Sequence, residues 1–190
     1  ESQSSETVQI VSRGKTVGEA LEEINAKTGW YPKLVFCNLI ILGESAKQTD
    51  VFDGLDFFLR DEYISDDCQL AGFDGQAKKL LDTSALIDPS SSSAIQKVIS
   101  SHAEQVGTVL PNTLREFSIG YFGDSRSSYL PVIKTEPQQE EIGQTTASTA
   151  DNNTQNSSEN GGGSGKTSEN PVFSARETAL FVQGRWVETL

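Results

Sequence analysis

The sequence is poor in the residues on which several classes of protein depend. Its 190 residues include no methionine, one histidine and two cysteines. One histidine cannot build a two-histidine zinc site, and two cysteines are too few for a disulfide framework. The longest apolar run, residues 34–42, is shorter than the roughly 18–20 residues of a membrane-spanning helix. The sequence therefore predicts neither a disulfide-rich scaffold nor a transmembrane segment.

Positive charge is also scarce. Fifteen Lys and Arg residues stand against 27 Asp and Glu, which gives a net charge of −12 at pH 7. Phosphates repel such a chain, so we expect no nucleic-acid partner and no attraction to an anionic membrane surface. The chain begins at Glu1 without an initiator methionine, and we expect it to be a processed or truncated piece.

A polar insert, residues 135–171, divides the chain. It consists mostly of Ser, Thr, Asn, Gln, Gly and Glu, and cannot bury enough apolar area to offset backbone ordering of roughly 1–2 kcal/mol per residue. We expect it to be disordered, and residues 1–134 and 172–190 to form one α+β domain. Residues 161–167 end in Gly-Lys-Thr, but lack the first glycine and the flanking strand and helix of a phosphate-binding loop. They are therefore interpreted as a flexible linker.

Strand-like and helix-like segments alternate on both sides of the insert. Period-two patterns and apolar runs predict strands at 7–12, 34–42, 67–73, 128–133, 178–182 and 185–190. Helical periodicity and capping signals predict helices at 17–28, 50–60, 77–81, 91–106 and 114–121. We expect 34–42 to be a central strand and 128–133 an edge strand, because Pro131 cannot donate to a ladder. The predicted fold is α+β, a mixed sheet with several helices packed against it and a final hairpin around Gln183-Gly184.

Candidate catalytic residues are few. His102 could act as a general base, although it also fits the half-buried face of its helix. Acidic pairs could serve a hydrolase or, at residues 61–67, a divalent cation, but the cation-binding spacing is absent and solvated loop charge is the favoured interpretation; the pairs are Glu22-Glu23, Asp61-Glu62 and Asp66-Asp67. No nucleophile-elbow, zinc-protease or dinucleotide motif occurs. We therefore predict no catalytic residue, no cofactor and no metal.

Two other groups of residues invite a functional interpretation. Cys37 and Cys68 fall in the predicted strands 34–42 and 67–73, so they are either a cross-strand disulfide or two buried thiols. Aromatic residues occur at element ends, where they could contact a partner or a ligand or could cap the core; these are Trp30, Tyr31, Tyr121 and Phe122.

Several segments together resemble a known family. They are Gly14-Lys15-Thr16 with Glu19-Ala20-Leu21, residues 34–36, 39–44, 53–61, 77–81 and 109–117, and the final hairpin. Their order and spacing resemble the N-terminal domain of the Ger(x)C family, the lipoprotein C subunit of bacterial spore germinant receptors. The resemblance covers about residues 12–134 and 178–190. The polar insert is longer than the family pattern implies.

This resemblance implies a non-enzymatic, extracytoplasmic interaction subunit of a nutrient germinant receptor. It implies integral-membrane receptor subunits as partners, and a lipid anchor outside this sequence at the outer face of the spore inner membrane. Neither Cys37 nor Cys68 would carry that lipid. Two alternatives remain: an envelope-located module that binds a small ligand through its aromatic residues, and a hydrolase that uses His102 or an acidic pair.

Overall fold

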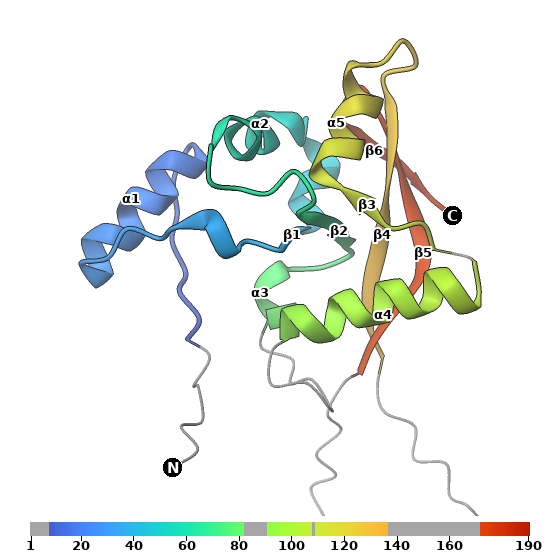
Figure 1. The fold of residues 1–190 in the computed structure, drawn as a ribbon, viewed down its shortest axis with the longest axis horizontal. Coiled ribbons are helices and arrows are strands. Elements are labelled where there is room, and N and C mark those ends of the chain that lie inside the picture. The colour runs from blue at the N-terminus through green and yellow to red at the C-terminus, as the bar shows by residue number, and fades with distance from the viewer. Residues whose placement is uncertain (1–7, 82–90, 108, 137–171) are drawn as a thin grey trace, which may run out of the picture.

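The computed structural model describes residues 8–81, 91–107, 109–136 and 172–190 (Figure 1). Over these residues the chain forms five α-helices and a mixed six-stranded sheet, which confirms the predicted α+β class. The helices are α1 (Val17–Thr28), α2 (Phe52–Arg60), α3 (Ala77–Leu81), α4 (Ser91–Gln105) and α5 (Leu114–Phe122). The strands are β1 (Leu39–Leu42), β2 (Gln69–Phe73), β3 (Asn112–Thr113), β4 (Ser127–Glu136), β5 (Val172–Val182) and β6 (Arg185–Thr189). Two short 3-10 helices, η1 (Leu34–Phe36) and η2 (Glu44–Gln48), flank β1.

The sheet combines parallel and antiparallel pairing. Its order is β1-β2-β4-β5-β6, and the short β3 pairs with β2 beside this path. β2 runs parallel to both β1 and β4, whereas β4, β5 and β6 form an antiparallel meander. None of the helices in the described segments is long and apolar enough to cross a membrane.

The two faces of the sheet each have a hydrophobic core. Neighbouring strand residues point to opposite faces, so Leu70 and Val132 belong to one core and Ala71 and Ile133 to the other. Residues of α2 and α5 complete the first core, and residues of α3 and α4 complete the second. Figure 1 shows α5 and α4 over different parts of the β4–β5 ribbon. Helix α1 contributes no residue to either core but contacts α2, and Leu21 is its single buried residue.

Both predicted capping signals start helices. The Thr113 hydroxyl accepts the Glu116 amide while the Glu116 carboxylate accepts the Thr113 amide, each at 3.2 Å. At α1 the Thr16 hydroxyl accepts the Glu19 amide at 3.2 Å, as predicted. The Glu19 carboxylate, however, accepts the amide of Lys15 at 2.7 Å instead of that of Thr16. The second hydrogen bond of this capping box is thus made to the residue before the predicted one.

The prediction of a central strand over residues 34–42 is wrong. Only Leu39–Leu42 is extended, and this strand lies at the edge of the sheet with β2 as its neighbour. Residues 34–36 form η1, closed by the Cys37 amide, which donates to the Leu34 carbonyl at 2.8 Å. Leu34 and Cys37 both pack against the α2–α5 core. A helical turn brings residues three apart onto one face, whereas a strand would turn them to opposite faces.

The prediction that Pro131 marks an edge strand is also wrong, because β4 lies between β2 and β5. Pro131 stands opposite Thr178 of β5. Thr178 exchanges both of its backbone hydrogen bonds with Leu190, each at 2.9 Å, so it needs no amide from Pro131. On the other side, pairing with β2 starts only at Val132. Because Pro131 lacks a backbone N–H, it can occupy an interior strand only where no hydrogen bond to the neighbouring strand is required, and its position opposite Thr178 meets this condition on the β5 side.

Residues 8–12 form no strand, although 7–12 was predicted to be one. None of the described strands lies beside this segment to share its hydrogen bonds, and its apolar side chains are exposed; Val8 is 77% exposed. Side chains hold it instead. The Lys27 ammonium donates to the Val11 carbonyl at 3.2 Å, and the Gln9 amide donates to the Leu81 carbonyl at 2.6 Å.

The polar insert begins later than predicted. Thr135 and Glu136 belong to β4, where Glu136 stands opposite Val172 of β5. Their polar side chains suit a half-exposed strand end, so composition alone misplaced the boundary. The rest of the insert, including residues 161–167, lies outside the described residues. The assignment of 1–134 and 172–190 to one domain stays a prediction.

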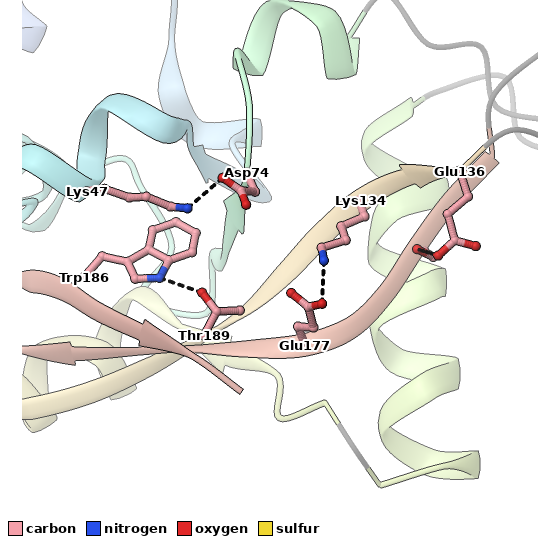
Figure 2. Close-up of polar contacts among 8 residues, drawn as sticks. Lys47, Asp74, Lys134, Glu136, Glu177, Trp186 and Thr189 are labelled. Atoms are coloured by element: carbon pink, nitrogen blue, oxygen red, sulfur yellow. Dashed lines mark hydrogen bonds and ion pairs between the residues drawn. The ribbon is translucent and has the colours of Figure 1, made fainter.

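The final hairpin is confirmed, and it carries a buried tryptophan. Gln183 and Gly184 have positive φ angles of 51° and 74°, the conformation that a tight two-residue hairpin loop requires. Trp186 of β6 is only 8% exposed and donates from Nε1 to Thr189 Oγ1 at 3.0 Å (Figure 2). The Lys47 Nζ atom lies 4.8 Å from the ring centroid and pairs with Asp74 at 2.6 Å. The end of the chain is thereby tied to the segments that flank β1 and β2.

Gly72 of β2 leaves room for this indole, and we predict that Gly72→Ala is destabilising. An added Cβ would lie 2.8 Å from Trp186 Cη2 and 3.0 Å from Cζ3. Overpacking of this kind costs about 1–3 kcal/mol, which urea unfolding would measure. Gly54→Ala is the matched control, because nothing lies within 4 Å of its added Cβ in α2. That change should stabilise by about 0.5–1 kcal/mol. Equal effects of the two substitutions would contradict the predicted contact.

Candidate functional site

Exposed aromatic side chains gather after the end of α1, in residues 30–36, which we call the aromatic loop. Trp30 is 80% exposed, Phe36 is 89% exposed and Tyr31 is 55% exposed. Tyr63, which follows α2, is 62% exposed and shares a pocket with Tyr31. Large aromatic groups are normally buried, and a cluster left in water indicates an interaction surface. Figure 1 shows α1 at one end of the longest axis, away from α5 and β6, and the segment after it runs from that end towards β1.

The backbone of the aromatic loop is fixed although its side chains face water. Gly29 ends α1 in a left-handed conformation, with φ of 73°, and its amide donates to the Asn25 carbonyl at 2.7 Å. The Thr28 hydroxyl accepts the Trp30 amide at 3.1 Å. At the other end, Leu34 and Cys37 are anchored against the core. The outward side chains are therefore presented on a loop that is held at both ends.

Two pockets adjoin the loop and share the side chains of Tyr31 and Asp61. The first, of about 520 Å³, is lined mainly by the loop itself, from Tyr31 to Val35, together with Tyr63. The second, of about 500 Å³, lies between the start of α1 and α2; it is lined by Thr16, Val17, Gly18, Tyr31, Asp53, Asp56, Phe57, Arg60 and Asp61. Arg60 pairs with Asp56 at 2.7 Å, which leaves the second pocket with excess negative charge. The site thus joins an aromatic surface to an acidic groove.

The four aromatic residues predicted as contacts fall into two separate places. Trp30 and Tyr31 belong to the aromatic loop. Tyr121 instead stacks on Phe52, with centroids 3.9 Å apart, and its hydroxyl donates to Asp50 Oδ2 at 3.3 Å. Desolvation and the Asp50 carboxylate raise the pKa of the Tyr121 phenol. Phe122 lies edge-on beside Tyr121 and is 72% exposed. Tyr121 is therefore a structural residue, and Phe122 is a second exposed aromatic site.

Sequence reasoning missed Phe36 and Tyr63 as surface residues. Phe36 lies in an apolar run that was interpreted as a buried strand. Tyr63 stands in the acidic segment 61–67, which was interpreted from its charges alone. The signal that could have found Phe36 is Pro32, which stands between two aromatics and the apolar run and favours a surface turn.

The candidate acid–base residues do not assemble a catalytic centre. His102 is half-buried on α4, as its helix position predicted, and its Nδ1 atom has no hydrogen-bond partner among the residues that the structure describes. Of the three acidic pairs, only Asp61 lines either of the two pockets. The Lys27 ammonium and the Arg13 amide lower the pKa of the Glu23 carboxyl, opposite to what a general acid needs. The residues that the structure describes hold no cluster of three or more His, Cys, Asp or Glu placed for a metal ion.

The fold and the site define a class of protein: a layered α+β domain with exposed aromatic side chains beside an acidic groove. Residues 1–135 match the family model described as the spore germination protein N-terminal domain. The chain belongs to this family, which confirms the resemblance found in its sequence. Membership of this family supports the role of a germinant receptor subunit in spore germination, and the family is not a known enzyme family. Searches of curated proteins and of solved structures found no significant match.

Proposed function

We propose that the chain is a non-enzymatic, extracytoplasmic interaction subunit of a spore nutrient germinant receptor. Integral-membrane receptor subunits are its partners, and a lipid anchor outside this sequence holds it at the outer face of the spore inner membrane. Family membership supports the receptor role. The observation that carries the interaction role is the aromatic loop, whose exposed Trp30 and Phe36 stand on a backbone fixed at both ends.

A fixed aromatic loop suits a protein partner for an energetic reason. Binding immobilises side chains and loops, and each immobilised flexible side chain costs about 0.5–1.5 kcal/mol. Trp, Tyr and Phe bury a large area with only two side-chain torsions, so they lose little entropy. The adjoining carboxylates Asp53 and Asp61 favour a partner that carries positive charge opposite them. The proposed interface therefore has an aromatic centre and an acidic margin.

Co-purification from spores tests this proposal. The spore inner membrane is solubilised in mild detergent, the protein is captured with an antibody to this domain, and its partners are identified by mass spectrometry. We expect polytopic receptor subunits in the captured material, and we expect deletion of the gene to abolish the response to at least one nutrient germinant. Recovery without receptor subunits, together with unchanged germination in every nutrient tested, would overturn the proposal.

A small-ligand module of the envelope is the second candidate, and one observation favours it. The pocket of about 520 Å³ beside Tyr31 and Tyr63 falls within the roughly 300–1,000 Å³ of small-molecule sites. A ligand at a hundredfold excess over its Kd raises stability by about 2.7 kcal/mol. A thermal shift with a nutrient or a cell-wall fragment that Tyr31→Ala removes would favour this candidate over the receptor interface.

A further inference from the structure

The two cysteines of the chain lie next to each other in space. Cys37 Sγ is 3.9 Å from Cys68 Sγ, although 31 positions separate them in the sequence. Both are free thiols. Neither lies within a strand, contrary to prediction: Cys37 follows η1 and Cys68 immediately precedes β2. The pair therefore sits just outside the β1–β2 ladder.

The backbone around the pair holds the two sulfur atoms together. The Gln69 amide donates to the Asn38 carbonyl at 3.0 Å, and the β1–β2 register starts one residue later with Leu39 opposite Gln69. On the N-terminal side of each cysteine, a backbone hydrogen bond fixes the preceding turn: the Cys37 amide closes the η1 turn, and the Cys68 amide donates to the Ser65 carbonyl at 2.9 Å. A disulfide needs an S–S distance of about 2.0 Å, so the sulfurs must approach by about 2 Å. Cys37 follows the η1 turn and is only half-buried, so the core does not enclose its side chain on every side.

The two thiols have different surroundings, and this gives them different chemistry. Cys68 is 1% exposed, whereas Cys37 is half-buried. The hydrogen bond between the two sulfur atoms, in which either can donate, lowers the pKa of Cys37 to about 7. The same interaction, together with burial, raises the pKa of Cys68. Cys37 is therefore the thiol that ionises first and that an external reagent can reach.

We infer that Cys37 and Cys68 form a reversible dithiol–disulfide site that reacts with low-molecular-weight disulfides. The Cys37 thiolate attacks one sulfur of an external disulfide such as oxidised glutathione, forms a mixed disulfide and releases one thiolate. The Cys68 sulfur, after losing its proton to solvent, then attacks Cys37 Sγ and releases the second thiol. The protein loses two electrons and two protons, and the external disulfide is reduced to two thiols.

This bond would bear on the aromatic loop, because Cys37 directly follows Phe36. An internal disulfide would fix the C-terminal end of the aromatic loop to the start of β2. The disulfide would also close a loop of about 30 residues in the unfolded chain. This lowers the conformational entropy of the unfolded chain, so we expect Tm to rise by about 5–10 °C for a chain of this size. The inference depends on the geometry of the two thiols and stands apart from the proposed receptor role.

Intact-mass spectrometry of the folded chain in glutathione buffers tests the site. With oxidised glutathione in excess, we expect the wild-type mass to fall by two hydrogen atoms and both thiols to become unreactive. Cys68→Ala should instead accumulate a glutathione adduct on Cys37. Cys37→Ala should react at least about tenfold more slowly, because Cys68 is buried. Wild-type protein that accumulates glutathione adducts, or forms the bond only in denaturant, would overturn the inference.

Trypsin cleavage after the exposed Lys33 gives a second readout on the loop itself. We expect oxidised wild-type protein to be cut there at least about threefold more slowly than reduced protein, because opening of the loop for the protease is restricted. The cutting rate of Cys37→Ala should not change with the glutathione ratio, because this variant forms neither the internal disulfide nor the adduct on Cys37. If that variant shows the same change as wild type, the disulfide is not its cause and the effect on the loop is refuted.

Discussion

Replacement of Trp186 by alanine should destabilise the protein by about 3–5 kcal/mol in urea unfolding. The indole is 8% exposed and fills the space over Gly72, where it joins the last strand to the centre of the sheet. Phe181 packs beside it with ring centroids 5.6 Å apart, so alanine would leave a cavity within the α2–α5 core. Proteins of this size are stable by about 5–15 kcal/mol, so the loss is a large fraction of the total.

Val187 provides the control for this prediction. It follows Trp186 on the same strand but points outward and is 57% exposed, so Val187→Ala should change stability by less than about 0.5 kcal/mol. Lys47→Ala removes the cation over the indole and a surface ion pair, which together are worth about 1 kcal/mol. If Trp186→Ala lowers the free energy of unfolding by less than about 1 kcal/mol, the indole does not contribute to the core packing described.

The same experiment bears on domain organisation. We propose that residues 1–134 and 172–190 fold as one domain, because β5 pairs with β4 over ten residues and contributes buried Ala175, Ala179 and Phe181. Unfolding of Trp186→Ala should then remain a single transition with a lower midpoint. Two separate transitions, in which the hairpin melts before the rest, would contradict this proposal.

Replacement of Trp30 and Phe36 together by serine should abolish capture of receptor subunits while leaving the fold intact. Central aromatic residues of an interface each contribute about 2 kcal/mol or more, which corresponds to roughly thirtyfold in Kd for one residue. Both side chains are at least 80% exposed, so stability should change by less than about 0.5 kcal/mol. The measurements are co-purification from detergent-solubilised spore membranes and thermal unfolding of the purified variant.

Phe122→Ser is the matched control for the aromatic loop. Phe122 is 72% exposed, is also aromatic, and lies on α5 away from the loop. We expect it to retain partner capture at the wild-type level. If Phe122→Ser loses the partner and the double variant keeps it, the interface lies at α5 and the assignment to the aromatic loop is wrong. If neither variant loses the partner, exposed aromatic residues do not mediate the contact.

Local signals in the sequence predicted much of the fold. Thr113 and Glu116 form a reciprocal capping box, and Gly29 and Gly107 end their helices with φ of 73° and 68°. These signals work because they act within a few residues, through hydrogen bonds between a side chain and its own backbone. The hairpin at Gln183-Gly184 was predictable for the same reason.

Strand position was not predictable in this way. Pro131 was interpreted as an edge residue, yet β4 is interior because β2 and β5 pair with its two sides. The proline is tolerated there because Leu190, far along the chain, takes the backbone hydrogen bonds of the opposite residue Thr178. Residues 34–42 were interpreted as central, yet β1 is an edge strand. The neighbours of a strand come from distant segments, so hydrophobicity of one segment does not reveal its place in the sheet.

Half of the candidate site could be inferred from the sequence. Trp30 and Tyr31 stand at a helix end, where polar residues normally occur, and this position predicted them as possible contact residues. Tyr121 has the same local setting, but stacking on Phe52 makes it part of the core. Whether an aromatic residue at a helix end faces water depends on what packs over it, and that partner can lie anywhere in the chain.

By itself, the sequence determined the starts and ends of most helices, the final hairpin, the family and the absence of a known catalytic motif. Each of these depends on residues close together in the chain or on an ordered set of short patterns. Only the tertiary structure decided which strands are central, which aromatic residues are exposed, and that Cys37 and Cys68 lie 3.9 Å apart. These properties come from contacts between segments distant in sequence, which are selected by the packing of the whole core.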